Sequence, residues 1–147
     1  MSECAFALCV AVVSSFGYKT KTQERVQVCQ QVVEWSQTMG VDASLSLSVA
    51  SVESGFRRGL RSSAGAVGPM QVMRQFWCKK KPCNLVESGV FALKTYTERH
   101  GTKSGLCHYS TGSKCSKKKV GLRYAKKVLR HKKIIERLVK SECVAGC

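Results

Sequence analysis

The sequence ESGFRRGLRSSAGAVGPMQVM spans residues 53–73 and is the most informative stretch of this 147-residue chain. Its part 55–68 is rich in glycine, serine and arginine, which is typical of a loop. Glu53 stands just before that loop and directly after the mostly apolar residues 49–52. If residues 43–54 form a helix, apolar side chains one turn back would desolvate the Glu53 carboxyl, raise its pKa and suit it to act as a general acid. The alternative on local sequence alone is a glutamate in water at a helix end.

Residues 43–54 match two periodic patterns. Apolar residues alternate with serines at period two, which is the pattern of a strand, but Leu45, Val49 and Val52 also fit one face of a helix. Periodicity alone leaves both interpretations open. Asp42 stands immediately before the segment and is well placed to cap a helix.

Three further helices are expected, each from its start signal, its stop signal or its apolar face. They are a helix capped by Thr20 or Thr22 and ended by Gly40, one that begins with the capping-box pair Asn84 and Glu87 and ends at Gly101, and a basic helix over 120–139. No internal repeat and no second domain is visible. Because a domain typically has about 100 to 200 residues, we predict a single, mainly α domain.

The charge of the chain is strongly unbalanced. There are 25 Lys and Arg against 9 Asp and Glu, so the net charge is +16 and the chain should be attracted to a polyanion. The positive charge is densest over 117–140, which is either a solvated helix face or a surface that binds an anionic wall polymer or lipopolysaccharide. Nucleic acid is the least favoured partner because no known binding motif is present. No apolar run approaches the ~20 residues of a transmembrane helix, so no membrane span is expected.

Nine cysteines are many for a protein kept reduced, and their close spacing favours an oxidising compartment. The closely spaced pairs are Cys78 with Cys83, Cys107 with Cys115, and Cys143 with Cys147. We predict disulfides for the first two pairs. No C-x-x-C motif and no histidine ligand pattern is present, so neither zinc nor another metal is expected.

The amino-terminal residues 1–17 have two interpretations. Residues 5–13 form an apolar run of signal-peptide length, and small residues that suit cleavage follow it. However, Glu3 stands where a signal peptide usually carries a basic residue. The segment is therefore either a signal peptide or an apolar helix packed on the domain. In both cases the domain itself is expected to span residues 18–147.

The stretch from Glu53 to Met73 resembles the signature of the soluble lytic transglycosylases. That family's pattern reads E-S-x-F and then S-x-x-G-A-x-G-L-M-Q-x-M, and this chain follows its spacing without a gap. Further along, 84–89 is similar to the family's N-x-x-x-x-G, 109–112 to its Y-N-x-G and 124–129 to its Y-A-x-x-V-L. The resemblance covers residues 26–130 and implies a single lysozyme-like domain, related to goose-type lysozyme, in which 43–54 is a helix.

The resemblance also implies an activity: cleavage of the β-1,4 bond between N-acetylmuramic acid and N-acetylglucosamine in peptidoglycan, leaving a 1,6-anhydro end. No cofactor is implied. The matching site residues would be Glu53 as the single acid and base, Ser62 and Gln71 as ligands of the muramyl residue, Met70 on the cleft wall, Tyr109 near Glu53, and Ser110 where the family usually has Asn. A serine hydroxyl can still donate or accept a hydrogen bond there. Trp77 is a better candidate for stacking on a sugar than Trp35, which fits a helix core.

The positions of the carboxylates support a single-carboxylate mechanism independently. Glycosidases with two carboxyls hold them about 5 to 9.5 Å apart, but no acidic residue occurs between Ser54 and Val86, and Asp42 is expected to serve as a cap. The alternatives are a goose-type lysozyme-like hydrolase of the same bond and a catalytically inactive, cationic wall-binding module. Action on the wall implies an extracytoplasmic location, or delivery by a phage or a secretion apparatus.

Overall fold

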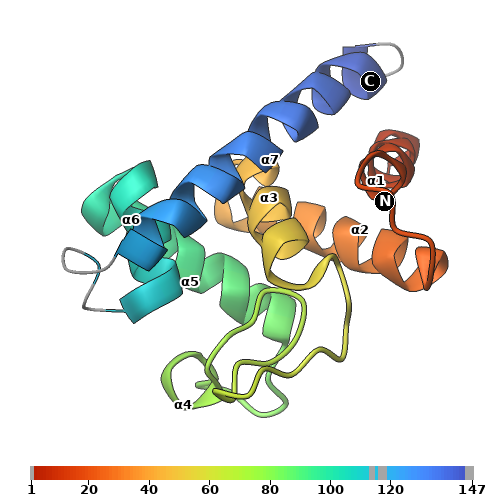
Figure 1. The fold of residues 1–147 in the computed structure, drawn as a ribbon. Coiled ribbons are helices and arrows are strands. Elements are labelled where there is room, and N and C mark those ends of the chain that lie inside the picture. The colour runs from red at the N-terminus through yellow and green to blue at the C-terminus, as the bar shows by residue number, and fades with distance from the viewer. Residues whose placement is uncertain (1, 113–114, 116–118, 145–147) are drawn as a thin grey trace.

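The computed structural model describes residues 2–112, 115 and 119–144, with side chains to Glu142, and is mainly α as predicted (Figure 1). The helices are α1 Glu3–Ser15, α2 Thr22–Met39, α3 Ala43–Ser54, α4 Arg74–Trp77, α5 Leu85–His100, α6 Thr102–Thr111 and α7 Lys119–Val144. Within the described residues there is no strand, and Val67 forms isolated bridges with Arg61 and Val72. No helix in this part of the chain is long and apolar enough to cross a membrane.

The central helix is α3, which packs against both α2 and α7. Its serines are buried, yet several of their hydroxyls have partners: Ser48 donates to the Ser44 carbonyl one turn back at 2.5 Å, and the Ser51 hydroxyl lies 2.9 Å from Nδ1 of His131 on α7. These bonds explain how a sequence with serines at period two forms a fully packed helix. The Asp42 carboxylate accepts from the Ser44 N–H at 2.9 Å, so the helix interpretation and its cap are confirmed.

The other helix ends agree with the sequence in part. The Asn84 side chain accepts from two N–H groups at the start of α5, and Gly40 ends α2 in the left-handed conformation. However, α2 begins without a threonine cap, so that prediction is wrong. Lys21 is the N-cap residue with φ of 54°. Its carbonyl accepts the first hydrogen bond of the helix, from the main-chain N–H of Arg25 at 3.0 Å.

The amino-terminal segment is a packed helix. α1 lies against α2 and α7 and places Leu8, Val12 and Val13 in the core. A disulfide between Cys9 and Cys29 joins it to α2.

The two predicted disulfides, Cys78–Cys83 and Cys107–Cys115, are confirmed. Cys4 is also disulfide-bonded. The close pair Cys143 and Cys147 lies outside the residues whose side chains the structure describes.

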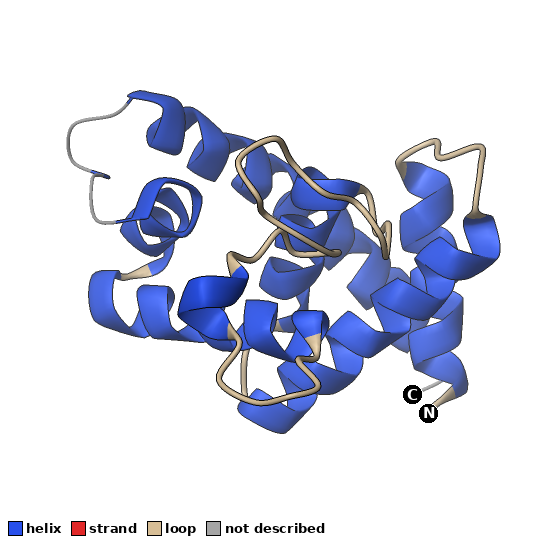
Figure 2. Cartoon of the chain, turned by 90° about the horizontal axis from the view of Figure 1, so that it is seen from below, coloured by secondary structure: helices blue, strands red, loops and turns tan. Residues whose placement is uncertain are grey.

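The long connection from α3 to α5 crosses one end of the helical frame and contains α4 (Figure 2). Ser54 fastens it to α3, because its hydroxyl donates to the Pro69 carbonyl at 2.7 Å. Gly55 is required at the turn: its φ is 61°, and a Cβ there would lie 2.8 Å from the Tyr18 ring. The Arg25 guanidinium donates to the Gly55 carbonyl and closes the turn from the side of α2.

Candidate active site

Glu53 is the next-to-last residue of α3, where the helix meets the loop. Burial disfavours its charged form and raises the pKa of the carboxyl from 4.5 to about 7. The hydroxyl of Tyr124 on α7 lowers this pKa in part. No charged side chain is among the groups that shift it, although the chain carries a net charge of +16. The carboxyl is therefore protonated in part of the molecules at neutral pH.

Two tyrosines adjoin the Glu53 carboxyl. Tyr109 on α6 donates its hydroxyl hydrogen to the Met70 carbonyl at 2.6 Å. Tyr124 has a buried hydroxyl that, within the described residues, has no hydrogen-bond partner of normal geometry, so its approach to Glu53 is a polar contact rather than a formed hydrogen bond. Burial first, and the Glu53 charge second, raise the pKa of both phenols well above the usual range. Both tyrosines thus stay neutral while Glu53 titrates.

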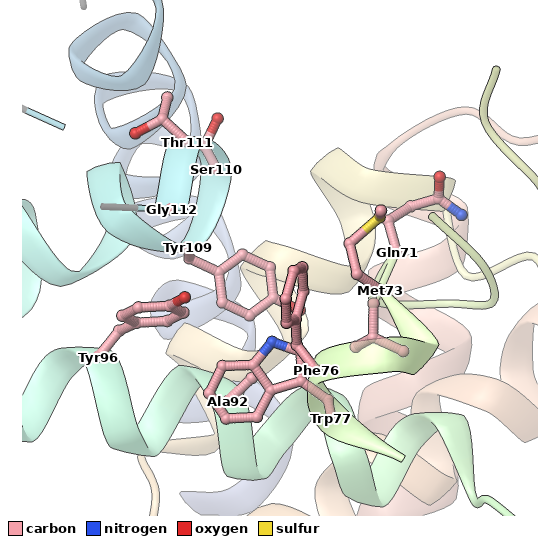
Figure 3. A pocket seen from close by; sticks show the side chains of 11 residues that line it. Gln71, Met73, Phe76, Trp77, Ala92, Tyr96, Tyr109, Ser110, Thr111 and Gly112 are labelled. Carbon is pink, nitrogen blue, oxygen red and sulfur yellow. The ribbon is translucent and has the colours of Figure 1, made fainter. Parts of the chain in front are cut away.

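A cleft of about 610 Å³ shares Tyr109 with this cluster. Figure 3 shows the side chains that line the cleft. It is lined by Gln71, Val72, Met73, Phe76, Trp77, Ala92, Tyr96, Tyr109, Ser110, Thr111 and Gly112. The Tyr96 ring meets the rings of Trp77 and Tyr109 edge to face, with centroids 5.5 and 6.4 Å away. Aromatic faces beside polar groups suit the binding of a sugar, which has both apolar and hydroxyl-bearing surfaces.

Three of the expected substrate ligands lie at this cleft, namely Gln71, Tyr109 and Ser110. Gln71 is held in an unusual backbone conformation with φ of 52°, and its amide N–H groups donate to two loop carbonyls, of Leu60 and Gly68. Among the described residues, these bonds leave its side-chain oxygen without a protein donor. Ser62 does not line the cleft, and its hydroxyl accepts from the Ala66 N–H at 3.0 Å within the loop.

The side chain of Met70 is not on the cleft wall, where we expected it. It is fully buried and packs so closely on Gly89 of α5 that a Cβ at Gly89 would lie 2.5 Å from it. The Met70 main-chain carbonyl instead receives the Tyr109 hydroxyl, and the methionine that lines the cleft is Met73. Met70 therefore fixes the position of the loop rather than contacting the cleft.

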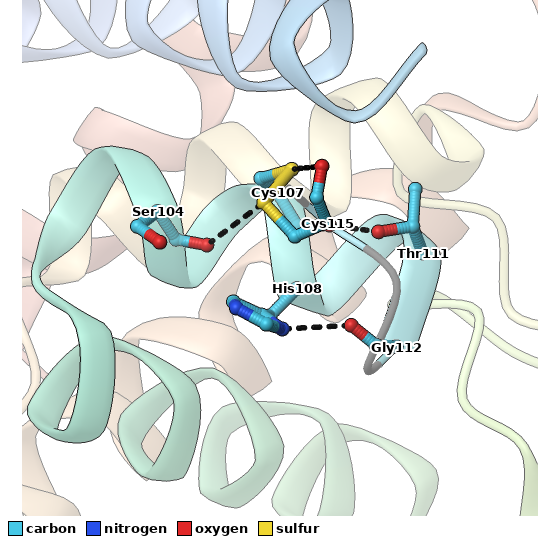
Figure 4. Close-up of a disulfide and its surroundings, with 6 residues drawn as sticks. All are labelled: Ser104, Cys107, His108, Thr111, Gly112 and Cys115. Atoms are coloured by element: carbon cyan, nitrogen blue, oxygen red, sulfur yellow. Dashed lines mark hydrogen bonds between the residues drawn. A yellow bond between two sulfur atoms is a disulfide. The ribbon is translucent and has the colours of Figure 1, made fainter. Parts of the chain in front are cut away.

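The Cys107–Cys115 disulfide is anchored next to the cleft wall formed by 109–112 (Figure 4). Two hydrogen bonds inside this segment add to it: His108 donates to the Gly112 carbonyl at 2.7 Å, and Thr111 donates to the Cys107 carbonyl at 2.9 Å. This wall is thus held by a covalent bond as well as by helix α6.

Sequence reasoning missed a role for Tyr124 and for two cleft residues, Phe76 and Tyr96. Tyr124 opens the closing Y-A-x-x-V-L motif, but its contact with Glu53 depends on how α7 crosses α3 and has no local signal. The adjacent pair Phe76 and Trp77 was the available signal for an aromatic cleft wall. Trp77 lines the cleft, and Trp35 packs against the core.

The sequence profile of the transglycosylase SLT domain matches residues 30–131, which include Glu53, both tyrosines and the whole cleft. The chain belongs to the transglycosylase SLT family. No curated protein and no solved structure matches it at a significant level.

Because the chain belongs to the transglycosylase SLT family, its helices form a single lysozyme-like domain. It also places the protein among peptidoglycan-degrading enzymes of the lytic transglycosylase type, which act on the cell wall. Glu53 does not itself line the cleft, but its carboxyl has a raised pKa and interacts with Tyr109, which does; a raised pKa next to a cleft is typical of a catalytic acid.

Proposed function

We propose that the protein is a lytic transglycosylase that cleaves the β-1,4 bond between N-acetylmuramic acid and N-acetylglucosamine and forms 1,6-anhydro-N-acetylmuramic acid. The observation that carries the proposal is the Glu53 carboxyl, whose pKa is raised to about 7 by burial and lowered in part by the Tyr124 hydroxyl, with no second carboxylate shifting it. A group that is protonated in part of the molecules at neutral pH can both give and accept a proton.

The reaction would use Glu53 in both half-reactions. Its carboxylic acid protonates the glycosidic oxygen, the bond from that oxygen to C1 of the muramyl residue breaks, and the N-acetylglucosamine portion leaves as an alcohol. The resulting oxocarbenium-like C1 is attacked by the muramyl 6-hydroxyl oxygen, while the Glu53 carboxylate takes the hydroxyl proton. The ring closes, Glu53 is an acid again, and no water is consumed.

Further residues are proposed to hold the substrate. Gln71 has a free side-chain oxygen at the cleft that would accept from a sugar hydroxyl or amide, and Ser110 would bind a hydroxyl at the opposite wall. Tyr109 would orient Glu53 from within the cleft. Ser62 and Met70 would contribute through the loop conformation, as Ser62 binds the Ala66 N–H and Met70 binds Tyr109. The proposal includes no metal and no cofactor.

Mass spectrometry of digested peptidoglycan tests this proposal. The products should be muropeptides lighter by one water than those of lysozyme, without a free reducing end. A goose-type lysozyme-like hydrolase would release reducing sugars instead. A catalytically inactive wall-binding module would release nothing while binding the wall, and either result would contradict the proposal.

The basic part of α7 is proposed to hold the enzyme on an anionic wall polymer or lipopolysaccharide. A shallow groove of about 840 Å³ there is lined by Lys103, Val120, Arg123, Tyr124, Lys126, Lys127, Leu129, Arg130 and Lys133. Within the described residues none of its cations forms an ion pair, so their charge faces solvent. Together with the disulfides, which favour an oxidising compartment, this supports an extracytoplasmic site of action, reached by secretion or by delivery with a phage or secretion apparatus.

A further inference from the structure

A second groove lies beside the cleft and shares a wall with it. It has a volume of about 370 Å³, and Phe76 and Trp77 line both spaces. Figure 3 shows these two rings from the side of the cleft. The far side of the groove is formed by the Cys78–Cys83 loop and the first turns of α5. A substituent on a sugar bound in the cleft would reach this groove by passing the two shared rings.

The groove presents aromatic rings to solvent. Phe76 and Phe91 are 62% and 52% exposed, and Trp77 meets Phe91 edge to face at a centroid distance of 6.1 Å. Single exposed apolar side chains are common on protein surfaces and need no explanation. Three rings that gather around one groove, next to a site, indicate a binding surface.

The charges at the groove come from a short covalent loop. Lys79 and Lys80 line the groove, and the Cys78–Cys83 disulfide closes the loop that carries them. Neither lysine forms an ion pair in the part of the chain that the structure describes. The groove also contains one acid, Glu87 of α5. It therefore offers two cations and one anion around an apolar floor.

We propose that this groove binds the peptide stem of the same strand whose glycan lies in the cleft. The inference rests on the proposed function. The glycan has no negative charge to attract lysines, because the muramyl carboxyl is used in the amide bond to the stem. The stem has free carboxylates for Lys79 and Lys80 and an amine on its third residue for Glu87. Because the disulfide restrains the loop, less side-chain and backbone freedom is lost on binding.

Turnover on two soluble substrates tests the proposal: glycan strands with intact stems, and strands from which an amidase has removed the stems and whose freed muramyl carboxyls have then been converted to amides, so that the stem-free glycan carries no negative charge. Lys79→Gln/Lys80→Gln should raise KM for stem-bearing strands by about three- to tenfold, which is the value of two exposed ion pairs. KM for stem-free strands should stay at the wild-type value. Lys19→Gln/Lys21→Gln removes the same charge from two exposed lysines of the α1–α2 connection and should change neither KM. An equal rise on both substrates would overturn the assignment.

A binding measurement separates this inference from the proposed function. A muramyl tetrapeptide titrated into Glu53→Gln should shift the indole N–H resonance of Trp77 in NMR spectra and leave that of Trp35 unchanged. Adding Lys79→Gln/Lys80→Gln should weaken the shift. If the wild type yields no anhydro products but the lysine-dependent shift occurs, the proposed function fails and the groove assignment stands. If the products are correct but Trp77 responds to a wall polyphosphate and not to the tetrapeptide, the stem assignment fails.

Discussion

Helices α3 and α7 pack against each other and have opposite compositions. α3 has nine buried residues among twelve and carries a single charged side chain, Glu53. α7 is rich in lysine and arginine and contacts the core through a narrow set of residues that includes Ala125, Val128 and Ile135. What α7 presents to Glu53 is the phenol of Tyr124, and none of its cations shifts the pKa of that carboxyl.

This difference shows how a chain with net charge +16 keeps a carboxyl protonated near neutral pH. A cation close to Glu53 would stabilise the carboxylate and lower its pKa, whereas burial without a cation raises it. Ion pairs on α7 occur away from the site: Lys132 binds Asp42 at 3.4 Å and also binds Glu136. The packing of α7 on α3 thus keeps the cations of α7 from shifting the pKa of the Glu53 carboxyl.

The largest effect is expected from removing the charge of α3. Glu53→Gln keeps the shape of the side chain but removes the acidic proton that would be given to the glycosidic oxygen, so it should lower kcat by about 10²- to 10⁴-fold. Release of anhydro-muropeptides measures this. A Glu53→Gln variant that keeps near wild-type turnover would contradict the role of Glu53.

The same substitution should stabilise the fold. Since the pKa of Glu53 is about 7 in the folded chain and 4.5 as its ordinary value, the wild type loses stability as pH rises through this interval. Above it, Glu53→Gln should be more stable by up to about 3 kcal/mol, and below pH 4 the difference should vanish. Urea denaturation at both pH values measures this, with equal midpoints at pH 8 as the contrary result.

Removing positive charge from α7 should weaken binding to the wall and leave the turnover of a short soluble glycan unchanged. Lys126, Lys127, Arg130 and Lys133 all line the basic groove, and replacing these four by Gln should weaken binding to whole walls at low salt by about tenfold or more. The difference should shrink at 0.15 M salt, where screening acts over about 8 Å. Co-sedimentation with walls measures binding, and a short soluble glycan serves as the control substrate. A similar loss of turnover on that glycan would show that the two helices are not separated in function.

A smaller effect is expected where the two helices meet. Tyr124→Phe removes the hydroxyl that lowers the pKa of Glu53, so this pKa should rise above about 7. Because the reaction begins with protonated Glu53, the loss of activity at alkaline pH should move to higher pH. At pH 6 the cost in kcat should not exceed about tenfold, the value of one hydrogen bond. The pH profile of kcat/KM measures the shift, and a move to lower pH would refute this account of the Tyr124 contact.

The smallest effect is expected at the start of α3. Asp42→Asn keeps a capping side chain and loses the contact with Lys132, so it should cost about 1 kcal/mol or less in the free energy of unfolding. Thermal unfolding measures the cost. Turnover should match the wild type, because Asp42 is a cap and an ion-pair partner; a large loss would mean that a second carboxylate takes part.

Features with local causes could be predicted from the sequence. The caps at Asp42 and Asn84 and the Cys78–Cys83 and Cys107–Cys115 bonds depend on neighbours only a few residues away. The helical state of α3 could not be predicted from periodicity, because the apolar residues of the segment fit both the strand pattern and the helix pattern. The resemblance from Glu53 to Met73 decided it, and the bonds of the buried Ser48 and Ser51 hydroxyls show how the helix accommodates its serines.

Features that depend on long-range packing could not be predicted. Tyr124 meets Glu53 because α7 crosses α3, and Cys9 meets Cys29 because α1 folds back on α2. The burial of Met70 instead of Met73 depends on the close approach of the loop to Gly89. In each case the deciding contact joins elements whose relative positions have no signature in the local sequence.

The two disulfides beside the cleft also suggest how a producing cell would be protected. One is anchored next to the wall formed by 109–112, and the other closes the loop that follows Trp77. In a reducing cytoplasm both bonds would be open, and each wall would lose a restraint worth about 2 to 3 kcal/mol under the chain-entropy model. The newly made enzyme would therefore be least competent where it is synthesised, and its cleft would become rigid only in the oxidising space that holds the wall.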